Sequence, residues 1–312
     1  MRLIAKAVSK DYLDVSFQSG TNTVEIVERP GRWMTADRLE KLRSDLTGIA
    51  TATLETGALD YGVLSGNRER LENAIVTLVR RTSDGKPVAF NALSLMDCNL
   101  SASRCRIIHL GLVMIDPQER QKGLSWILYG LTCLLLFIRG GLRPLYVSNV
   151  TQVPAVVGMV CETFSEVCPS PEEPEPSDFR KILIAREIMQ NHRHVFGVGA
   201  DADFDEKRFV IRNAYTGGSD DLKKTIEQTT RHRDEKYNAW CRNELNYDRG
   251  DDVLQIGLID LAAAQRYVAR AVPRGSLMQL AALGTLVFAR RVFLPAAHWF
   301  NSEKDYGLLR AR

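Results

Sequence analysis

The stretch Val113-Met-Ile-Asp-Pro-Gln-Glu-Arg-Gln-Lys-Gly-Leu-Ser125 decides how this chain is interpreted, because it joins a predicted strand to a predicted helix. Residues 106–115 form a run long and apolar enough for a buried strand. Residues 124–138 are strongly apolar, contain no proline and are followed by the pair Gly140-Gly141. This pattern favours a largely buried helix that ends at Arg139.

The polar residues 118–123 lie between these two elements. A turn here would place unpaired backbone N–H groups at the start of the helix, where they and the helix dipole suit a phosphate. Arg120 and Lys122 add positive charge. An ordinary strand-to-helix connection with solvated charges would use the same residue types, and this alternative stays open.

The segment Arg120-Gln-Lys-Gly123-Leu-Ser125 resembles the phosphate-binding segment of the GNAT acyltransferase superfamily. The signature of that family is Arg or Gln, two residues, Gly, one residue, then Gly or Ala. Ser125 departs from it mildly, since a hydroxyl adds little bulk. In this family a pair such as Asp116-Pro117 commonly leads into the turn.

The order of predicted elements across residues 20–168 also resembles the GNAT fold. It runs from a strand at 24–28 and a helix after Thr35 to a hairpin at 74–95, the strand at 106–115 and the apolar helix, and then to a strand at 144–149 and a helix at 151–163. The resemblance implies an α/β fold with a mixed, splayed sheet flanked by helices.

The resemblance further implies that the chain binds acyl-CoA as co-substrate. Turn amides from Gln121 to Ser125 would hold the pyrophosphate, and an N–H near Val113 or Met114 would bind the thioester oxygen. Asn149 would end the strand that borders the acyl-CoA cleft. The implied binding residues are Val113, Met114, Ile115, Arg120, Gln121, Lys122, Gly123, Leu124, Ser125 and Asn149.

Acyl transfer to an amine also needs a proton acceptor. His109 is the candidate, since it is the only imidazole in the core strands, although a hydrogen-bonded core histidine is the alternative. The family's usual Tyr and Glu fall at Met159 and Gly111, so neither is present. Two cysteines near this strand, Cys98 and Cys105, could be nucleophiles, but small buried cysteines are commoner.

Composition narrows the function classes. Hydrophobic residues make up 45% and charged residues 25% of 312 residues, as in ordinary globular proteins. A net charge of +3 is too small to indicate nucleic-acid binding. The apolar run at the N-terminus is too short for a secretory core, so we expect a cytoplasmic protein. Six cysteines without a CxxC pair favour reduced thiols, and no histidine spacing predicts a metal site.

We expect two regions: an acyl-CoA-binding domain at 1–215, with a Pro-rich insertion at about 168–177, and an α-helical C-terminal extension at 216–312. One extension helix is predicted to begin at Ser219, and another to lie between Asp251 or Asp252 and Pro273. The last apolar run, Ser276 to Leu294, has three interpretations. It could be a buried or homo-oligomer-forming helix, a membrane-surface helix, or a true span.

These features together predict an N-acyltransferase that moves an acyl group from acyl-CoA, acetyl-CoA by default, to an unidentified amine by direct attack. One alternative is a non-catalytic acyl-CoA-binding or assembly protein, since the family's Tyr and Glu are missing. Another is a long-chain acyltransferase acting on lipid-like substrates, because of the apolar C-terminal run.

Overall fold

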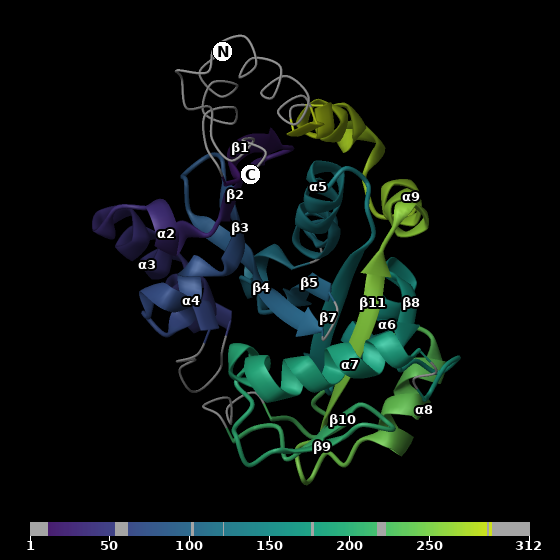
Figure 1. Cartoon of the computed structure of the whole chain (residues 1–312). Helices are drawn as coiled ribbons and strands as arrows, with labels where there is room; N and C mark the ends of the chain where they lie inside the picture. The colour runs from purple at the N-terminus through teal and green to yellow at the C-terminus, as the bar shows by residue number, and fades with distance from the viewer. Residues whose placement is uncertain are drawn as a thin grey trace.

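A computed structural model describes residues 12–53, 62–100, 103–120, 122–175, 178–216, 223–285 and 287–288. An 11-stranded sheet runs through the molecule in the order β1-β2-β3-β4-β5-β7-β11-β10-β9, with β6 paired to β4 and β8 paired to β11 (Figure 1). The strands are β1 (Asp14–Ser19), β2 (Asn22–Glu28), β3 (Ala74–Arg81), β4 (Pro87–Leu100), β5 (Ser103–Leu110), β6 (Val113–Ile115), β7 (Leu145–Thr151), β8 (Ser165–Cys168), β9 (Asp203–Asp205), β10 (Val210–Arg212) and β11 (Asp252–Ile259).

Helices cover both faces of this sheet. Side chains alternate along each strand, so Val147 packs with α5, α6 and α9 on one face, while Tyr146 packs with α7 on the other. The helices α3 and α4 share the α7 face over β2, β3 and β4. The helices are α2 (Pro30–Trp33), α3 (Ala36–Thr53), α4 (Arg68–Glu72), α5 (Thr132–Arg139), α6 (Pro154–Thr163), α7 (Phe179–Glu187), α8 (Glu235–Glu244) and α9 (Leu261–Arg270).

The predicted fold class is confirmed: the sheet is open and mixed, and helices flank it. β5 and β7 are parallel, with Ile107 opposite Tyr146 and Leu110 opposite Asn149, while the other paired strands in the described part of the chain are antiparallel. The predicted hairpin forms as β3 and β4, with Gly85 at a φ of 69° in its turn. Such a positive φ favours glycine, which has no Cβ to clash.

The predicted strand at 106–115 is divided into β5 and β6 by a bulge. Ser94 pairs with His109, but Asn91 pairs with Val113, so one extra residue stands opposite β4. Gly111 lies in the bulge, where a Cβ would come within 2.3 Å of the Ala92 carbonyl oxygen. The chain therefore needs glycine there to keep β6 against β4.

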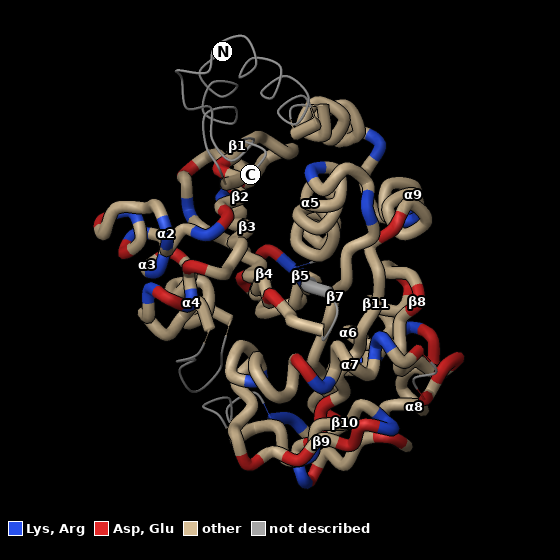
Figure 2. The backbone as a smooth tube through the Cα atoms, viewed as in Figure 1, with Lys and Arg blue, Asp and Glu red and all other residues tan. Residues whose placement is uncertain are grey.

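The apolar helix after the turn forms as predicted and ends at Arg139. A π-helical turn, η3 (Ile127–Leu131), precedes α5 and widens the helix by one residue. Figure 2 shows α5 without charged residues before its last one, which agrees with its burial between the sheet and α9.

The prediction of a helix between Asp251 or Asp252 and Pro273 was wrong in its first half. Residues 252–259 form β11, which pairs with β7 from Val253 to Ile259, and helix α9 begins only at Leu261. The run Val253-Leu-Gln-Ile-Gly-Leu-Ile259 is buried on both faces, and such a short apolar run does not show whether it is helix or strand. The region at 216–312, which we expected to be a helical extension after the sheet, thus contributes strand β11 to the sheet itself.

Two other expectations for the C-terminal region changed. Ser219, the predicted start of a long helix, lies outside the described residues, and the helix that forms, α8, begins later with Asp234 as its cap. Residues 277–285 are helical and bury Leu280 and Leu283 in the core of α5 and α9, while Met278 is 81% exposed. Residues 289–294 lie outside the described part of the chain. Among the described helices, none has both the length and the apolar character that a membrane crossing requires.

Candidate functional site

A cavity of about 330 Å³ lies where β5 and β7 separate. The two strands stay paired up to Leu110 and Asn149. After Leu110 the chain bends through Gly111 toward β4, whereas β7 continues alongside β11 to Thr151. Two strands that part in this way leave an opening between their ends, and side chains from both faces of the sheet line it.

One side of the cavity belongs to the face covered by α5 and α6. Tyr129 from η3 and Met159 from α6 line it, and both pack against that core. Burial raises the pKa of Tyr129, so its hydroxyl keeps its proton at neutral pH. Asn91 lies nearby, and its amide nitrogen donates a hydrogen bond to the carbonyl oxygen of Leu128.

The other side of the cavity belongs to the face covered by α7. His109 lies here, 4.9 Å from the ring of Phe196 between ring centres, and its Nδ1 lies 3.1 Å from Oγ of Ser148. The imidazole is buried, and burial lowers its pKa to about 4. His109 is therefore neutral at pH 7, because its pKa lies well below the ordinary imidazole value of about 6.5. The assignment of His109 as base stays a prediction.

Asp252 and Tyr215 line the same side of the cavity. The Tyr215 hydroxyl donates a 2.8 Å hydrogen bond to Oδ1 of Asp252. Burial raises the pKa of Asp252 to about 7; the hydrogen bond from Tyr215 opposes that rise, and the charge of Asp251 adds to it. An acid of this kind changes its charge near neutral pH, which is the behaviour of a general base.

The backbone of β6 directs one N–H toward the opening. The amide of Ala92 donates to the Leu112 carbonyl, and the amide of Asp116 donates to the Val88 carbonyl. Alternate residues of an antiparallel strand bond to the same neighbour, so Met114 continues this ladder and Val113 directs its N–H away from β4. Val113 lines the cavity, and the side chain of Met114 packs in the core below α3.

The glycine turn lies outside the cavity, further along the same chain. Gly123 has a φ of 73° and is exposed, as are Arg120 and Ser125, whereas Leu124 is buried. Helical geometry begins at Ser125, so the first N–H groups of this helix lack a helical partner. Gln121 lies outside the described residues.

The charges around the turn are partly neutralised. Glu119 is buried and forms ion pairs with Arg81 at 2.7 Å and Lys122 at 3.0 Å. The structure shows no ion pair to Arg120 from any residue it describes, which leaves this side chain available to a phosphate. The pKa of Glu119 is lowered, mainly by its hydrogen bond from Arg81, so the carboxylate stays ionised.

Of the predicted residues, the structure brings His109, Val113 and Asn149 to one cavity. The side chain of Asn149 is buried and bonds to Gln255 at 3.4 Å. The predicted turn residues follow the cavity along the chain without lining it. Cys98 and Cys105 lie opposite each other on β4 and β5 outside the cavity, and burial raises the pKa of Cys98 to about 12. Neither is suited to act as a thiolate nucleophile.

Sequence reasoning missed Tyr129, Tyr215 and Asp252. The acidic pair Asp251-Asp252 before an apolar run was taken only as a helix boundary. An acid at the end of a buried strand is a usable signal, but it identifies a site only once the neighbours of that strand are known. Since β11 follows β7 by about a hundred residues, no local pattern places Asp252 in the cavity that His109 lines.

No family model and no curated protein matches the chain. Among solved structures, it is similar to a ribosomal-protein-S5-alanine acetyltransferase from Vibrio fischeri, with 17% identity, a TM-score of 0.27 and coverage of 43% of this chain and 74% of that one. It is also similar to a variant of the spermidine N-acetyltransferase SpeG from Vibrio cholerae, with 13% identity, a TM-score of 0.27 and coverage of 45% and 77%. Both are acetyltransferases, but likeness at this level carries no argument about activity.

Proposed function

We propose that this protein is an acyl-CoA-dependent N-acyltransferase in which the amine attacks the thioester directly. The observation that carries the proposal is the cavity between the diverging ends of β5 and β7, bordered by the bulged strand that leads into the glycine turn. A thioester threaded between these strands would present its carbonyl to the N–H of Val113. Its phosphates would lie at the turn, near Arg120 and the first amides of the helix.

The residues of the cavity would divide the chemistry between them. The Val113 N–H would stabilise the oxyanion that forms when the amine attacks. Met159 stands where the resemblance implies a tyrosine, so no acid is available there for the departing sulfur. A thiol with a pKa of about 8.5 can leave as a thiolate. The Tyr129 hydroxyl, which keeps its proton, lines the cavity on the same side.

The donor, the acceptor and the location of the protein are part of this proposal. We propose acetyl-CoA as the default donor and the cytoplasm as the location of the protein. Residues 276–294 would provide the surface for association with membranes or for homo-oligomer formation. The helix at 277–285 packs one face on α5. The approach is close at Gly284, where an added Cβ would lie 3.3 Å from Cδ1 of Ile138. That contact favours a structural role for the described part of the run.

The test is amine-dependent release of free thiol from acetyl-, hexanoyl- and palmitoyl-CoA, with thioester binding measured separately by calorimetry. Binding followed by thiol release only when an amine is present supports the proposal. Binding without release by any amine favours the non-catalytic acyl-CoA-binding alternative. Absence of binding contradicts both. A steep rise of kcat/KM with chain length, at about 0.8 kcal/mol for each buried CH₂, would instead indicate a long-chain acyltransferase.

A further inference from the structure

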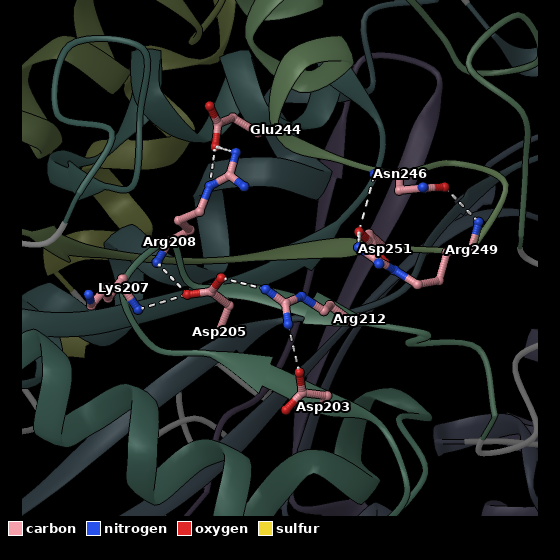
Figure 3. Close-up of polar contacts among 9 residues, drawn as sticks. All are labelled: Asp203, Asp205, Lys207, Arg208, Arg212, Glu244, Asn246, Arg249 and Asp251. Atoms are coloured by element: carbon pink, nitrogen blue, oxygen red, sulfur yellow. Dashed lines mark hydrogen bonds and ion pairs between the residues drawn. The ribbon is translucent and has the colours of Figure 1, made fainter.

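Two neighbouring buried aspartates at the start of β11 have opposite surroundings. Asp251 is 1% exposed, and its carboxylate accepts hydrogen bonds from Arg249 at 2.6 Å and from the backbone N–H of Asn246 at 3.1 Å (Figure 3). Arg249 donates a second bond at 2.7 Å, and the backbone N–H of Asn213 adds another at 3.4 Å. These contacts neutralise Asp251 and tie it to the loops around it, so its role is structural.

Asp252 is almost as buried, at 6% exposure, but its side chain faces the cavity. The described structure gives its carboxyl group one side-chain hydrogen bond, from Tyr215, and no ion pair. A carboxylate held this way can accept further hydrogen bonds. Its ionisation in this buried position costs stability, and functional sites are where proteins retain such costs.

The surroundings of Asp252 define what it could bind. The cavity walls on this side come mainly from the apolar residues Val150, Val195, Phe196 and Leu112, beside the polar residues Ser94 and His109. A carboxylate among apolar walls suits a ligand with one amino group and an apolar body. His109 lies on the same side, and the N–H of Val113 borders the same cavity. An amine held at Asp252 would therefore share the cavity with a thioester whose carbonyl lies at Val113.

We propose that Asp252 binds the amino group of the acceptor and accepts its proton during acyl transfer, while Tyr215 positions the carboxylate. This inference rests on the proposed function and names its acceptor as a primary amine with an apolar body. The amine nitrogen forms a bond to the thioester carbonyl carbon, and one N–H proton passes to the Asp252 carboxylate. The C–S bond then breaks, its electron pair leaves with the thiolate, and the proton on Asp252 returns to the thiolate or to solvent.

Among the described ionisable groups named here around Asp252, the others do not change their charge near neutral pH. Asp251 is bound to Arg249, and burial raises the pKa of Tyr247, which therefore stays neutral. The pKa of His109 is about 4, so this residue is already neutral above pH 5. Lys224 lines the cavity and is exposed.

The experiment uses the full chain with acetyl-CoA and three probes: n-butylamine, 2-phenylethylamine and leucine. Thiol release is measured from pH 5.5 to 9 for the wild type and for Asp252→Asn, Asp252→Glu and Tyr215→Phe. We expect kcat to rise through pH ~7 in the wild type. Asp252→Asn should lose ~100-fold or more in kcat together with this inflection, while acetyl-CoA binding is unchanged. Asp252→Glu should recover part of the rate, and Tyr215→Phe should move the inflection.

Stability separates this role from a structural one. The pKa of folded Asp252 lies above its unfolded value, so the folded state holds the extra proton and loses stability as pH rises from ~4 to ~7. Asp252→Asn should therefore raise Tm at pH 8. The matched control Asp251→Asn should lower Tm and keep the inflection. Full activity of Asp252→Asn, or a lowered Tm at pH 8, overturns the inference alone. If neither the wild type nor Asp252→Asn releases thiol although both bind acetyl-CoA, the proposed function is overturned as well.

Discussion

His109 Nδ1 lies 3.1 Å from Oγ of Ser148, its partner across the parallel pair β5 and β7, just before the two strands separate. This hydrogen bond links β5 to β7 near the end of their paired residues, next to the cavity. Both groups are buried, and nothing in this arrangement favours a charged imidazole.

His109 should make the protein sensitive to acid. Its pKa is about 4 in the folded state, against the ordinary imidazole value of 6.5, so the unfolded state takes up a proton first as pH falls below 6.5. The fold should lose about 2 kcal/mol by pH 5 through this residue. Denaturant titrations at pH 7 and pH 5 should show a smaller loss in His109→Gln. The same loss in both proteins would contradict the buried neutral state.

Gly123→Val should abolish coenzyme A binding. A β-branched residue is strained at a φ of 73°, so the turn would change shape and withdraw its amides. Arg120→Ala should weaken binding by only about 1 to 2 kcal/mol, the contribution of one charge-assisted hydrogen bond. Calorimetric titration measures both. Gly20→Val is the matched control: its φ is 58° and its surroundings are open, so it should cost stability but leave binding intact. Unchanged affinity in Gly123→Val would remove the turn from the proposed site.

Gly111→Ala should destabilise the protein by about 1 to 3 kcal/mol, because its Cβ would overlap the Ala92 carbonyl oxygen and push β6 from β4. Chemical denaturation gives the change. We expect kcat to fall as well, since Val113 would move. Gly48→Ala, in α3 and with open space around it, should instead stabilise the protein by roughly 0.5 to 1 kcal/mol. A stable and fully active Gly111→Ala would show that the bulge tolerates a side chain.

Arg139→Ala should destabilise the fold by about 3 kcal/mol, since it leaves the buried Glu28 carboxylate without its cation. The bonds from Arg139 and from the Leu13 amide lower the pKa of Glu28 against the opposing effect of burial. The stabilisation is present above the unfolded pKa of about 4.5 and is lost as pH falls below it. Thermal unfolding at pH 7 checks this prediction. Arg186→Ala, which breaks an exposed pair with Glu206, should cost less than about 1 kcal/mol.

Several elements were predictable because they depend on local patterns. The apolar run at 124–138 favours a buried helix whichever elements lie next to it. The hairpin at 74–95 is determined by its turn and by its alternating side chains. The bulge at Gly111 was not predictable, since glycine in an apolar strand does not show whether a neighbouring carbonyl will approach. The strand β11 was predicted as helix because a largely apolar run of seven residues suits either form until its neighbours are known.

The sequence by itself determined the order of the strands and helices from β2 to α6, the glycine turn and the apolar helix, since each follows from residues close together in the chain. Only the tertiary structure decided which side chains share the cavity. β11 pairs with β7 across about a hundred residues, and that pairing brings Asp252 to the cavity that His109 lines. Tertiary packing also decided the ionisation of both groups, because the free energy of a charge depends on the solvent and dipoles around it.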